Sequence, residues 1–143
     1  MKIIDLEPGD ERLISDLFPV LLQLRPHLDE DLLRTLYAEG HGHGLRFTAA
    51  YRDDGRCVGA AGWRLVVNTS TVRSLYVDDL VTADDVRSTG VGHRLLAHLE
   101  EYARAAGCRL LTLDSGTHRT DAHRFYHRER MAVTAFHFQK PLD

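Results

Sequence analysis

The stretch from Val77 to Leu96, VDDLVTADDVRSTGVGHRLL, constrains the fold more than any other part of the chain. An apolar strand ending at Val81 runs into a short acidic loop, then into Arg87-Ser88-Thr89-Gly90-Val91-Gly92, and then directly into an amphipathic helix. The first amides of a helix lack backbone partners, and the helix dipole adds about half a positive charge there. Gly90 and Gly92 remove side chains that would keep a phosphate away, and Arg87 can add charged donors. The stretch therefore predicts an anion site at a strand–loop–helix junction.

The spacing of this loop separates it from two common phosphate-binding motifs. A dinucleotide fingerprint needs three glycines and a later acidic residue, and a nucleotide P-loop ends in Gly-Lys-Ser/Thr. The pattern Arg87-x-x-Gly90-x-Gly92 instead resembles the acetyl-coenzyme A pyrophosphate loop of GNAT-superfamily N-acetyltransferases. The resemblance implies that the pantetheine arm of the coenzyme pairs along the strand before the loop. The coenzyme-binding residues implied are Leu80, Val81, Thr82, Arg87, Ser88, Thr89, Gly90, Val91, Gly92 and His93.

Length, charge and cysteine content limit the class of protein. A chain of 143 residues is long enough for one domain with a real core, and we expect a single domain over residues 1–143. A net charge of −3 gives no general attraction to nucleic acid. No apolar run approaches the roughly 20 residues of a membrane span, and no signal segment opens the chain. Two cysteines make no disulfide framework, so we expect a cytoplasmic protein. From the charge and the absence of a long apolar run, we expect no nucleic-acid or membrane partner.

Hydrophobic periodicity and turn residues outline the secondary structure. Strands are expected at residues 2–6, 45–52, 57–67, 71–81, 109–113 and 133–139. The three middle strands should form an antiparallel meander, in which Gly59 and Gly62 indicate a bulge or a close approach. Helices are expected around residues 13–24, where Pro19 interrupts the pattern, after a cap at Asp29, over 92–106 and near residue 125. The strand–helix–strand order from 71 to 113 implies a parallel pair with a right-handed crossover.

A second motif makes the resemblance specific. Ala122-x-x-Phe125-Tyr126 matches a short helix that in GNAT enzymes places a tyrosine beside the coenzyme sulfur. The two motifs are identified in family order across nearly the whole chain. They imply a GNAT-like α/β fold, with a mixed sheet of six to seven strands, about four helices and a splayed parallel strand pair. The family usually ends this helix with Gly-Phe, whereas this chain has Arg130-Met131, so Arg130 would have to adopt a left-handed conformation.

The resemblance implies direct transfer of acetyl from acetyl-coenzyme A, as co-substrate, to a primary amine. The amine must first lose a proton, since a free alkylamine has a pKa near ~10. Asp78 or Asp79, expected on opposite faces of their strand, would draw that proton, because many family members carry an acid here. The amide of Leu80 or Val81 would stabilise the oxyanion, and Tyr126 would protonate the leaving thiolate. His93 and His123 are weaker candidates for the base.

The acceptor is less constrained by the sequence. Acidic residues of the amino-terminal helices, such as Asp31 and Glu39, suit a cationic small-molecule amine, although exposed acids are usually only solubilising. A protein or peptide N-acetyltransferase and a non-catalytic acyl-coenzyme A sensor are the alternatives, and a homodimer is allowed. His41 and His43 form an H-x-H pair that could bind metal, but no third ligand is fixed by spacing, so we expect a loop and no metal site.

Overall fold

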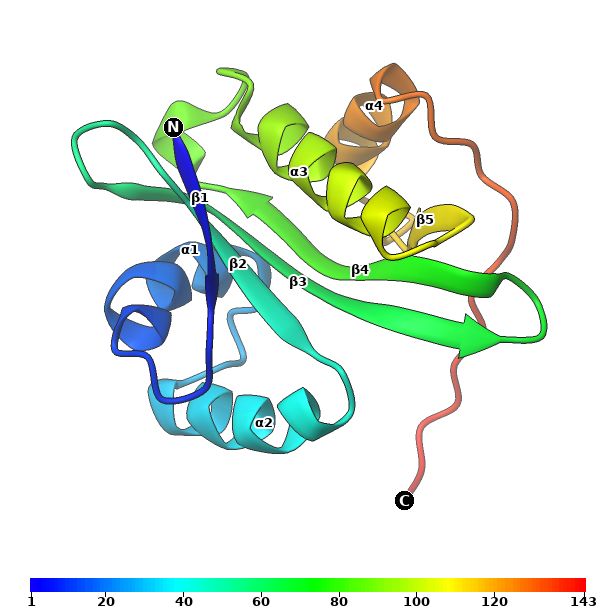
Figure 1. Cartoon of the computed structure of the whole chain (residues 1–143), viewed down its shortest axis with the longest axis horizontal. Helices are drawn as coiled ribbons and strands as arrows, with labels where there is room; N and C mark the ends of the chain where they lie inside the picture. Colours follow the sequence, from blue (N-terminus) through cyan, green and yellow to red (C-terminus); the bar gives the residue numbers. More distant parts are fainter. The chain divides into compact units, whose positions relative to one another are not determined.

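The structure, a computed structural model, describes residues 1–143 and divides into two compact units, Met1–Thr112 and Leu113–Asp143. Five strands form one sheet in the order β1-β2-β3-β4-β5 (Figure 1). The strands are β1 (Lys2–Leu6), β2 (Arg46–Tyr51), β3 (Cys57–Asn68), β4 (Val72–Thr82) and β5 (Leu110–Leu113). The α-helices are α1 (Phe18–Leu24), α2 (Glu30–Gly42), α3 (Val91–Ala105) and α4 (Thr120–Arg128). The mixed α/β fold with four helices is therefore confirmed.

The sheet combines an antiparallel part with one parallel pair. β1 to β4 pair antiparallel in chain order, so the predicted meander is confirmed. The amide of Arg109 donates to the carbonyl oxygen of Arg73 at 2.8 Å, which joins the beginnings of β5 and β4 and makes these two strands parallel. β5 has only four residues and β4 has eleven, so the second half of β4 has one backbone edge that β5 does not reach.

The predicted count of six to seven strands is wrong, because the segment from Val133 to Gln139 forms no strand. Its apolar and polar residues alternate as in a strand, but a strand also needs a neighbouring backbone and a surface on which to pack. Phe136 and Phe138 would share one face of a strand and are 85% and 90% exposed, and Val133 on the other face is 78% exposed, so neither face of the segment is packed. Alternation of side chains along the segment was therefore not sufficient to predict a strand.

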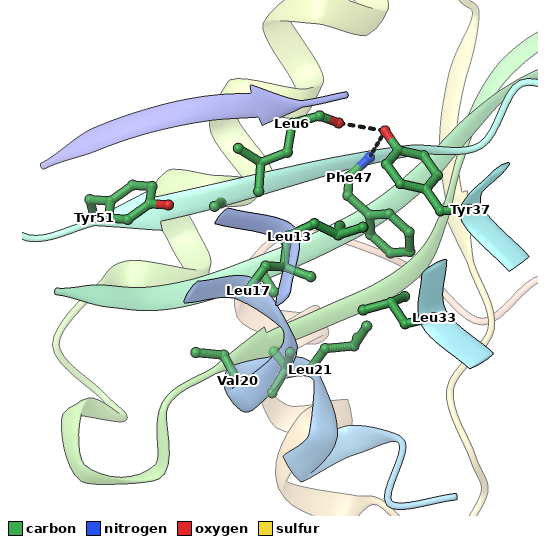
Figure 2. Close-up of a cluster of buried hydrophobic side chains, with 12 residues drawn as sticks. Leu6, Leu13, Leu17, Val20, Leu21, Leu33, Tyr37, Phe47 and Tyr51 are labelled. Carbon is green, nitrogen blue, oxygen red and sulfur yellow. Dashed lines mark hydrogen bonds between the residues drawn. The ribbon is translucent and has the colours of Figure 1, made fainter. Parts of the chain in front are cut away.

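One face of the sheet is covered by the amino-terminal helices (Figure 1). Their leucines pack on alternate residues of the strands in a continuous apolar cluster. Figure 2 shows Tyr37 at the edge of this cluster, where its hydroxyl donates to the carbonyl oxygen of Leu6 at 2.5 Å and accepts from the amide of Phe47 at 3.3 Å. These bonds join α2 to β1 and β2 and satisfy a buried hydroxyl.

The opposite face of the sheet is covered by α3. Leu95, Leu96 and Leu99 of its apolar stripe are fully buried, as the sequence predicted, whereas Tyr102, on the same predicted stripe, is 41% exposed. A Cβ atom on Gly59 of β3 would lie 2.8 Å from Leu95 Cδ1 and 2.9 Å from Val91 Cγ1. Gly59 therefore allows α3 to approach the sheet closely, and the close approach expected from the glycines of β3 is confirmed here.

The ends of the helices show which local signals were reliable. Asp29 caps α2, since its carboxylate accepts from the amide of Leu32 at 2.7 Å, as predicted. Pro19 lies in the first turn of α1, and the π-helical turn at Leu13–Leu17 runs directly into this helix through helical backbone at Leu17 and Phe18, so the chain changes from π- to α-helix next to the proline. The predicted loop at His41 is wrong in part, because α2 continues to Gly42 and His43 is its C-cap.

Candidate active site

The loop between β4 and α3 has the geometry of an anion cradle. Ser88 adopts φ 64° and Gly90 adopts φ 91°, so two left-handed residues lie within three positions. Left-handed residues in a turn direct successive amides into one concavity, and such strain at a non-glycine residue clusters at functional sites. The Thr89 hydroxyl donates to the carbonyl oxygen of Val86 at 2.5 Å and fixes the turn. Gly90 is the N-cap of α3 and supplies no capping side chain, so the first turn of α3 can offer amides to a ligand.

The charged side chains around this loop are exposed, and one of their ion pairs can be broken easily. Arg87 pairs with Asp84 at 2.7 Å, and both side chains are 65% exposed. An exposed pair of this kind contributes little stability, so Arg87 can leave Asp84 for a phosphate at small cost. The neighbouring Asp85 is bound by both terminal nitrogens of Arg56 at 2.6 Å, which lowers the pKa of that carboxyl. The loop is thus tied to the start of β3 through Asp85, while Arg87 remains available.

The end of β4 carries the two predicted carboxylates, and its register is interrupted there. Asp79 pairs with Gly62 of β3, but Trp63 pairs with Val77, so Asp78 is the extra residue of a β-bulge. This bulge was one of the two features that the glycines of β3 predicted, and it is confirmed. A Cβ atom on Gly62 would lie 2.6 Å from Asp79 Oδ2, so the missing side chain makes room for this carboxylate.

The expectation that the two carboxylates lie on opposite faces is wrong, because the bulge breaks the alternation. Trp63 lies on the α3 face, where its ring centroid is 4.7 Å from that of Tyr102. Arg64 follows Trp63 on a regular strand and therefore faces the other side, and it binds Asp78. Asp79 lies over Gly62, next to Phe47 of the cluster beneath α1 and α2. Both carboxylates thus face the side of the amino-terminal helices.

Each carboxylate has its own arginine. Arg64 binds Asp78 through two parallel bonds, from Nε to Oδ2 at 2.9 Å and from its terminal nitrogen to Oδ1 at 2.8 Å. Arg25 binds Asp79 through one bond, from Nε to Oδ1 at 2.8 Å. Burial raises the pKa of Asp79, and Arg25 acts against that rise. Sequence analysis missed both arginines, since Arg25 lies 54 positions from its partner and no local pattern joins them.

Tyr126 lies in the second unit, on α4. Its ring makes an edge contact with Phe125, with centroids 5.4 Å apart. Burial raises the pKa of the Tyr126 phenol, and the hydrogen bond from Arg119 acts in the opposite direction. An ordinary tyrosine is already protonated at neutral pH, so burial leaves Tyr126 in the form that a proton donor requires. The remaining site residues, from Asp78 to His93, all lie in the first unit.

The end of α4 has the conformation that the sequence predicted. Arg130 adopts φ 64°, a left-handed conformation that glycine adopts without strain. The amide of Met131 donates to the carbonyl oxygen of Tyr126 at 3.0 Å, and the amide of Arg130 donates to that of His127 at 3.0 Å. These two bonds form a Schellman motif, so the helix end is regular although its residue is not glycine.

Three residues named from the sequence, His123, His41 and Asp31, have partners outside the proposed coenzyme loop. A ring nitrogen of His123 lies 2.8 Å from the carbonyl oxygen of Gly116, and His41 lies 3.1 Å from a carboxylate oxygen of Glu7. Asp31 pairs with Arg34 of its own helix at 3.2 Å. In the described residues 1–143, no group of three or more His, Cys, Asp or Glu side chains is placed to hold a metal ion. No helix has the length and apolar character needed to cross a membrane.

Comparison with known proteins agrees with this geometry. Residues 11–130 match the model of the acetyltransferase (GNAT) family. The chain is 33% identical over 132 residues to the uncharacterized N-acetyltransferase YhdJ of Bacillus subtilis strain 168, which covers 90% of this chain and 91% of that protein. It is 42% identical over 66 residues to the aminoalkylphosphonate N-acetyltransferase of Salmonella typhimurium strain LT2, which covers 46% of this chain and 43% of that protein.

A solved structure supports the fold independently. A putative acetyltransferase from Agrobacterium tumefaciens strain C58 superposes with a TM-score of 0.81 at 23% identity, over 99% of this chain and 100% of the other. The fold, the glycine loop, the family match and the relatives agree. The chain is an acyltransferase and belongs to the GNAT family of N-acetyltransferases.

Proposed function

We propose that the protein transfers the acetyl group of acetyl-coenzyme A to the primary amine of a small molecule by direct attack on the thioester. The observation that carries the proposal is the strained glycine loop at the uncapped start of α3, which directly follows the strand bearing Asp78 and Asp79. An anion site and a candidate base are thereby built on one continuous segment.

The coenzyme is bound by backbone groups in this proposal. The amides at the start of α3, with Arg87, bind the pyrophosphate. The pantetheine arm lies along Leu80 to Thr82, where β4 has a backbone edge beyond the reach of the short β5. Ser88, Thr89, Val91, Gly92 and His93 complete the set proposed to contact the coenzyme.

The chemical steps need three groups. Asp78 or Asp79 accepts the proton that the ammonium must lose, directly or through water, and the amine nitrogen then attacks the thioester carbonyl carbon. The amide of Leu80 or Val81 donates to the oxyanion of the tetrahedral intermediate. When this intermediate collapses, the carbon–sulfur bond breaks and Tyr126 donates a proton to the departing thiolate. The attacking nitrogen loses its extra proton to water, from which the Tyr126 phenolate regains one.

The acceptor is tested with a panel of amines in a thiol-release assay. The panel contains an aminoalkylphosphonate, because the Salmonella relative is named for that substrate, together with aliphatic diamines, amino sugars and lysine peptides. Turnover with one or more small amines, and none with peptides, is the expected result. Turnover with peptides alone would replace the small-molecule proposal with peptide acetylation.

Three further statements complete the proposal: one acetyltransferase domain over residues 1–143, a cytoplasmic location and a homodimer. The two cysteines, Cys57 and Cys108, are free, which supports a reducing compartment. Cell fractionation tests the location, and sedimentation velocity tests the homodimer. Limited proteolysis tests whether the chain resists cleavage between its two compact units.

A further inference from the structure

Asp79 has the polar environment of a working base. Its side chain is 13% exposed, and Oδ1 accepts from Arg25 Nε at 2.8 Å. Oδ2 makes no hydrogen bond, yet it is not among the side-chain atoms sealed from solvent without a partner. It lies in the space left by the absent side chain of Gly62. Asp79 therefore has one oxygen that is held and one that a proton can reach.

Asp78 lacks this feature. Both of its oxygens accept from Arg64, which lies within 5.2 Å of the Tyr76 ring centroid and is held there by a cation–π contact. A carboxylate with both oxygens engaged by one guanidinium must break a bidentate pair before it can accept a proton. The two neighbours in the bulge thus differ in the one property that general-base catalysis needs.

Arg25 holds both sides of the bulge at once. It is the C-cap of α1, and its amide donates to the carbonyl oxygen of Leu21 at 2.9 Å. Its Nε binds Asp79 Oδ1 at 2.8 Å, and its terminal nitrogen donates to the backbone carbonyl oxygen of Asp78 at 2.9 Å. One guanidinium therefore connects the end of α1 to two consecutive residues of β4, and fixes the Asp79 carboxylate relative to the bulged backbone.

We propose that Asp79, and not Asp78, accepts the proton of the amine, and that Arg25 is the positioning residue that keeps the Asp79 carboxylate oriented and charged. This inference rests on the proposed acetyl transfer. It extends the proposal by dividing the work between the two carboxylates and by assigning a role to a residue of α1.

The charges that face Asp79 give the direction of the expected effect. Arg25, at the C-cap of α1, and His27, in the turn that follows, favour the ionised form of Asp79, whereas Asp78 on β4 opposes it and burial raises the pKa of Asp79. Arg64 neutralises Asp78 and makes no bond to Asp79. Loss of the Arg25 charge should therefore raise the pKa of Asp79 further, and fewer enzyme molecules would carry a free base at pH 7.

The test compares Arg25→Gln and Arg25→Lys with Arg64→Gln as the matched control. The Arg25 side chain is 42% exposed and that of Arg64 is 40% exposed, so each change removes one half-exposed guanidinium. For Arg25→Gln we expect kcat to fall about 10- to 100-fold. We also expect the acidic limb of the kcat/KM profile to move to higher pH, with KM for acetyl-coenzyme A changed less than about twofold. Arg25→Lys should recover part of the rate and reverse most of the pH shift. Arg64→Gln removes only the cation that neutralises Asp78, so it should move the acidic limb less than Arg25→Gln does.

A second readout does not need turnover. Titration of the Asp79 carboxyl carbon by NMR, in the folded protein without coenzyme, should give a higher midpoint in Arg25→Gln than in wild type. An acidic limb that moves in Arg64→Gln but not in Arg25→Gln would overturn the inference and assign the proton to Asp78. An unchanged NMR midpoint would also overturn it. If wild type acetylates no amine, the proposed function fails, and a raised NMR midpoint would still support the effect of Arg25 on the Asp79 charge.

Discussion

Gly59→Ala tests whether the packing of α3 on the sheet sets the position of the anion loop. The added Cβ would lie 2.8 Å from Leu95 Cδ1 and 2.9 Å from Val91 Cγ1. Carbon atoms normally make contact at about 3.5 Å or more, so the helix start must move outward by roughly 0.7 Å or strain its side chains. Leu95 can rotate, but Val91 is β-branched and stiff, and it is the first residue of α3. The displacement is therefore expected at the end of the helix that holds the proposed pyrophosphate site.

The two parts of the effect have different magnitudes. Overpacking typically costs about 1–3 kcal/mol, and replacing glycine by alanine returns about 0.4–1 kcal/mol through the unfolded chain. We expect a net loss of about 1 kcal/mol in the free energy of unfolding, which lowers Tm by about 4 °C for a chain of this length. Hydrogen bonds to a charged group contribute about 1.5–3 kcal/mol each. Partial loss of one such bond should weaken the binding of acetyl-coenzyme A about tenfold, or ~1.4 kcal/mol.

Thermal unfolding and calorimetric titration with acetyl-coenzyme A measure the two effects. Gly42→Ala is the matched control, since its added Cβ would meet nothing within 4 Å and its φ is ordinary. The control should keep the same Kd and gain a little stability, because alanine is favoured over glycine in a helix. A Gly59→Ala protein with wild-type Tm and wild-type Kd would refute the packing argument. A lower Tm with an unchanged Kd would show that the position of the start of α3 does not affect coenzyme binding.

Four other changes probe the rest of the site. Gly90→Val should weaken acetyl-coenzyme A binding at least tenfold in calorimetry, because valine is strained at φ 91° and blocks close approach of phosphate. An unchanged Kd in a folded variant would contradict the proposed pyrophosphate site. Tyr126→Phe should lower kcat on the order of 10²-fold without raising KM, since it removes one proton donor and keeps the ring, whereas full kcat would make Tyr126 a packing residue. Arg130→Gly should raise the free energy of unfolding by about 0.5–1 kcal/mol, because glycine adopts φ 64° without strain, and no gain in urea denaturation would count against that strain. The pKa of Asp79 in the folded protein is raised above its ordinary value of 3.8, so its contribution to stability is present at low pH and is lost as pH rises. Relative to Asp79→Asn, wild type should lose stability as pH rises above about 4, and parallel stability curves would exclude this.

The local elements and the loop could be predicted because their signals are short-range. Side chains alternate every two residues in a strand and repeat every 3.6 in a helix, and these periods located β1 to β5 and the buried stripe of α3. Caps and left-handed positions depend on a few neighbouring residues, so Asp29 and even Arg130 behaved as expected. Arg87 to Gly92 could be identified for the same reason, since loop and helix start are contiguous.

The predictions that depended on distant partners were less successful. The segment from Val133 to Gln139 has a strand pattern, but it forms no strand, because pairing requires a neighbouring backbone that alternation cannot supply. Asp78 and Asp79 were expected on opposite faces, because alternation holds only while the register continues. Gly62 indicated a bulge, but the sequence did not give its consequence for the two side chains.

The sequence by itself determined the order of the five observed strands and four helices, the family and the segment proposed to bind phosphate, because each depends on residues close together in the chain. Only the tertiary structure decided that both carboxylates face α1 and α2, and that Arg25 binds the Asp79 carboxylate while Arg64 binds that of Asp78. The physical reason is that a charge acts through space. Arg25 is 54 positions from Asp79, and only the packing of α1 on the bulged sheet brings the two within 2.8 Å.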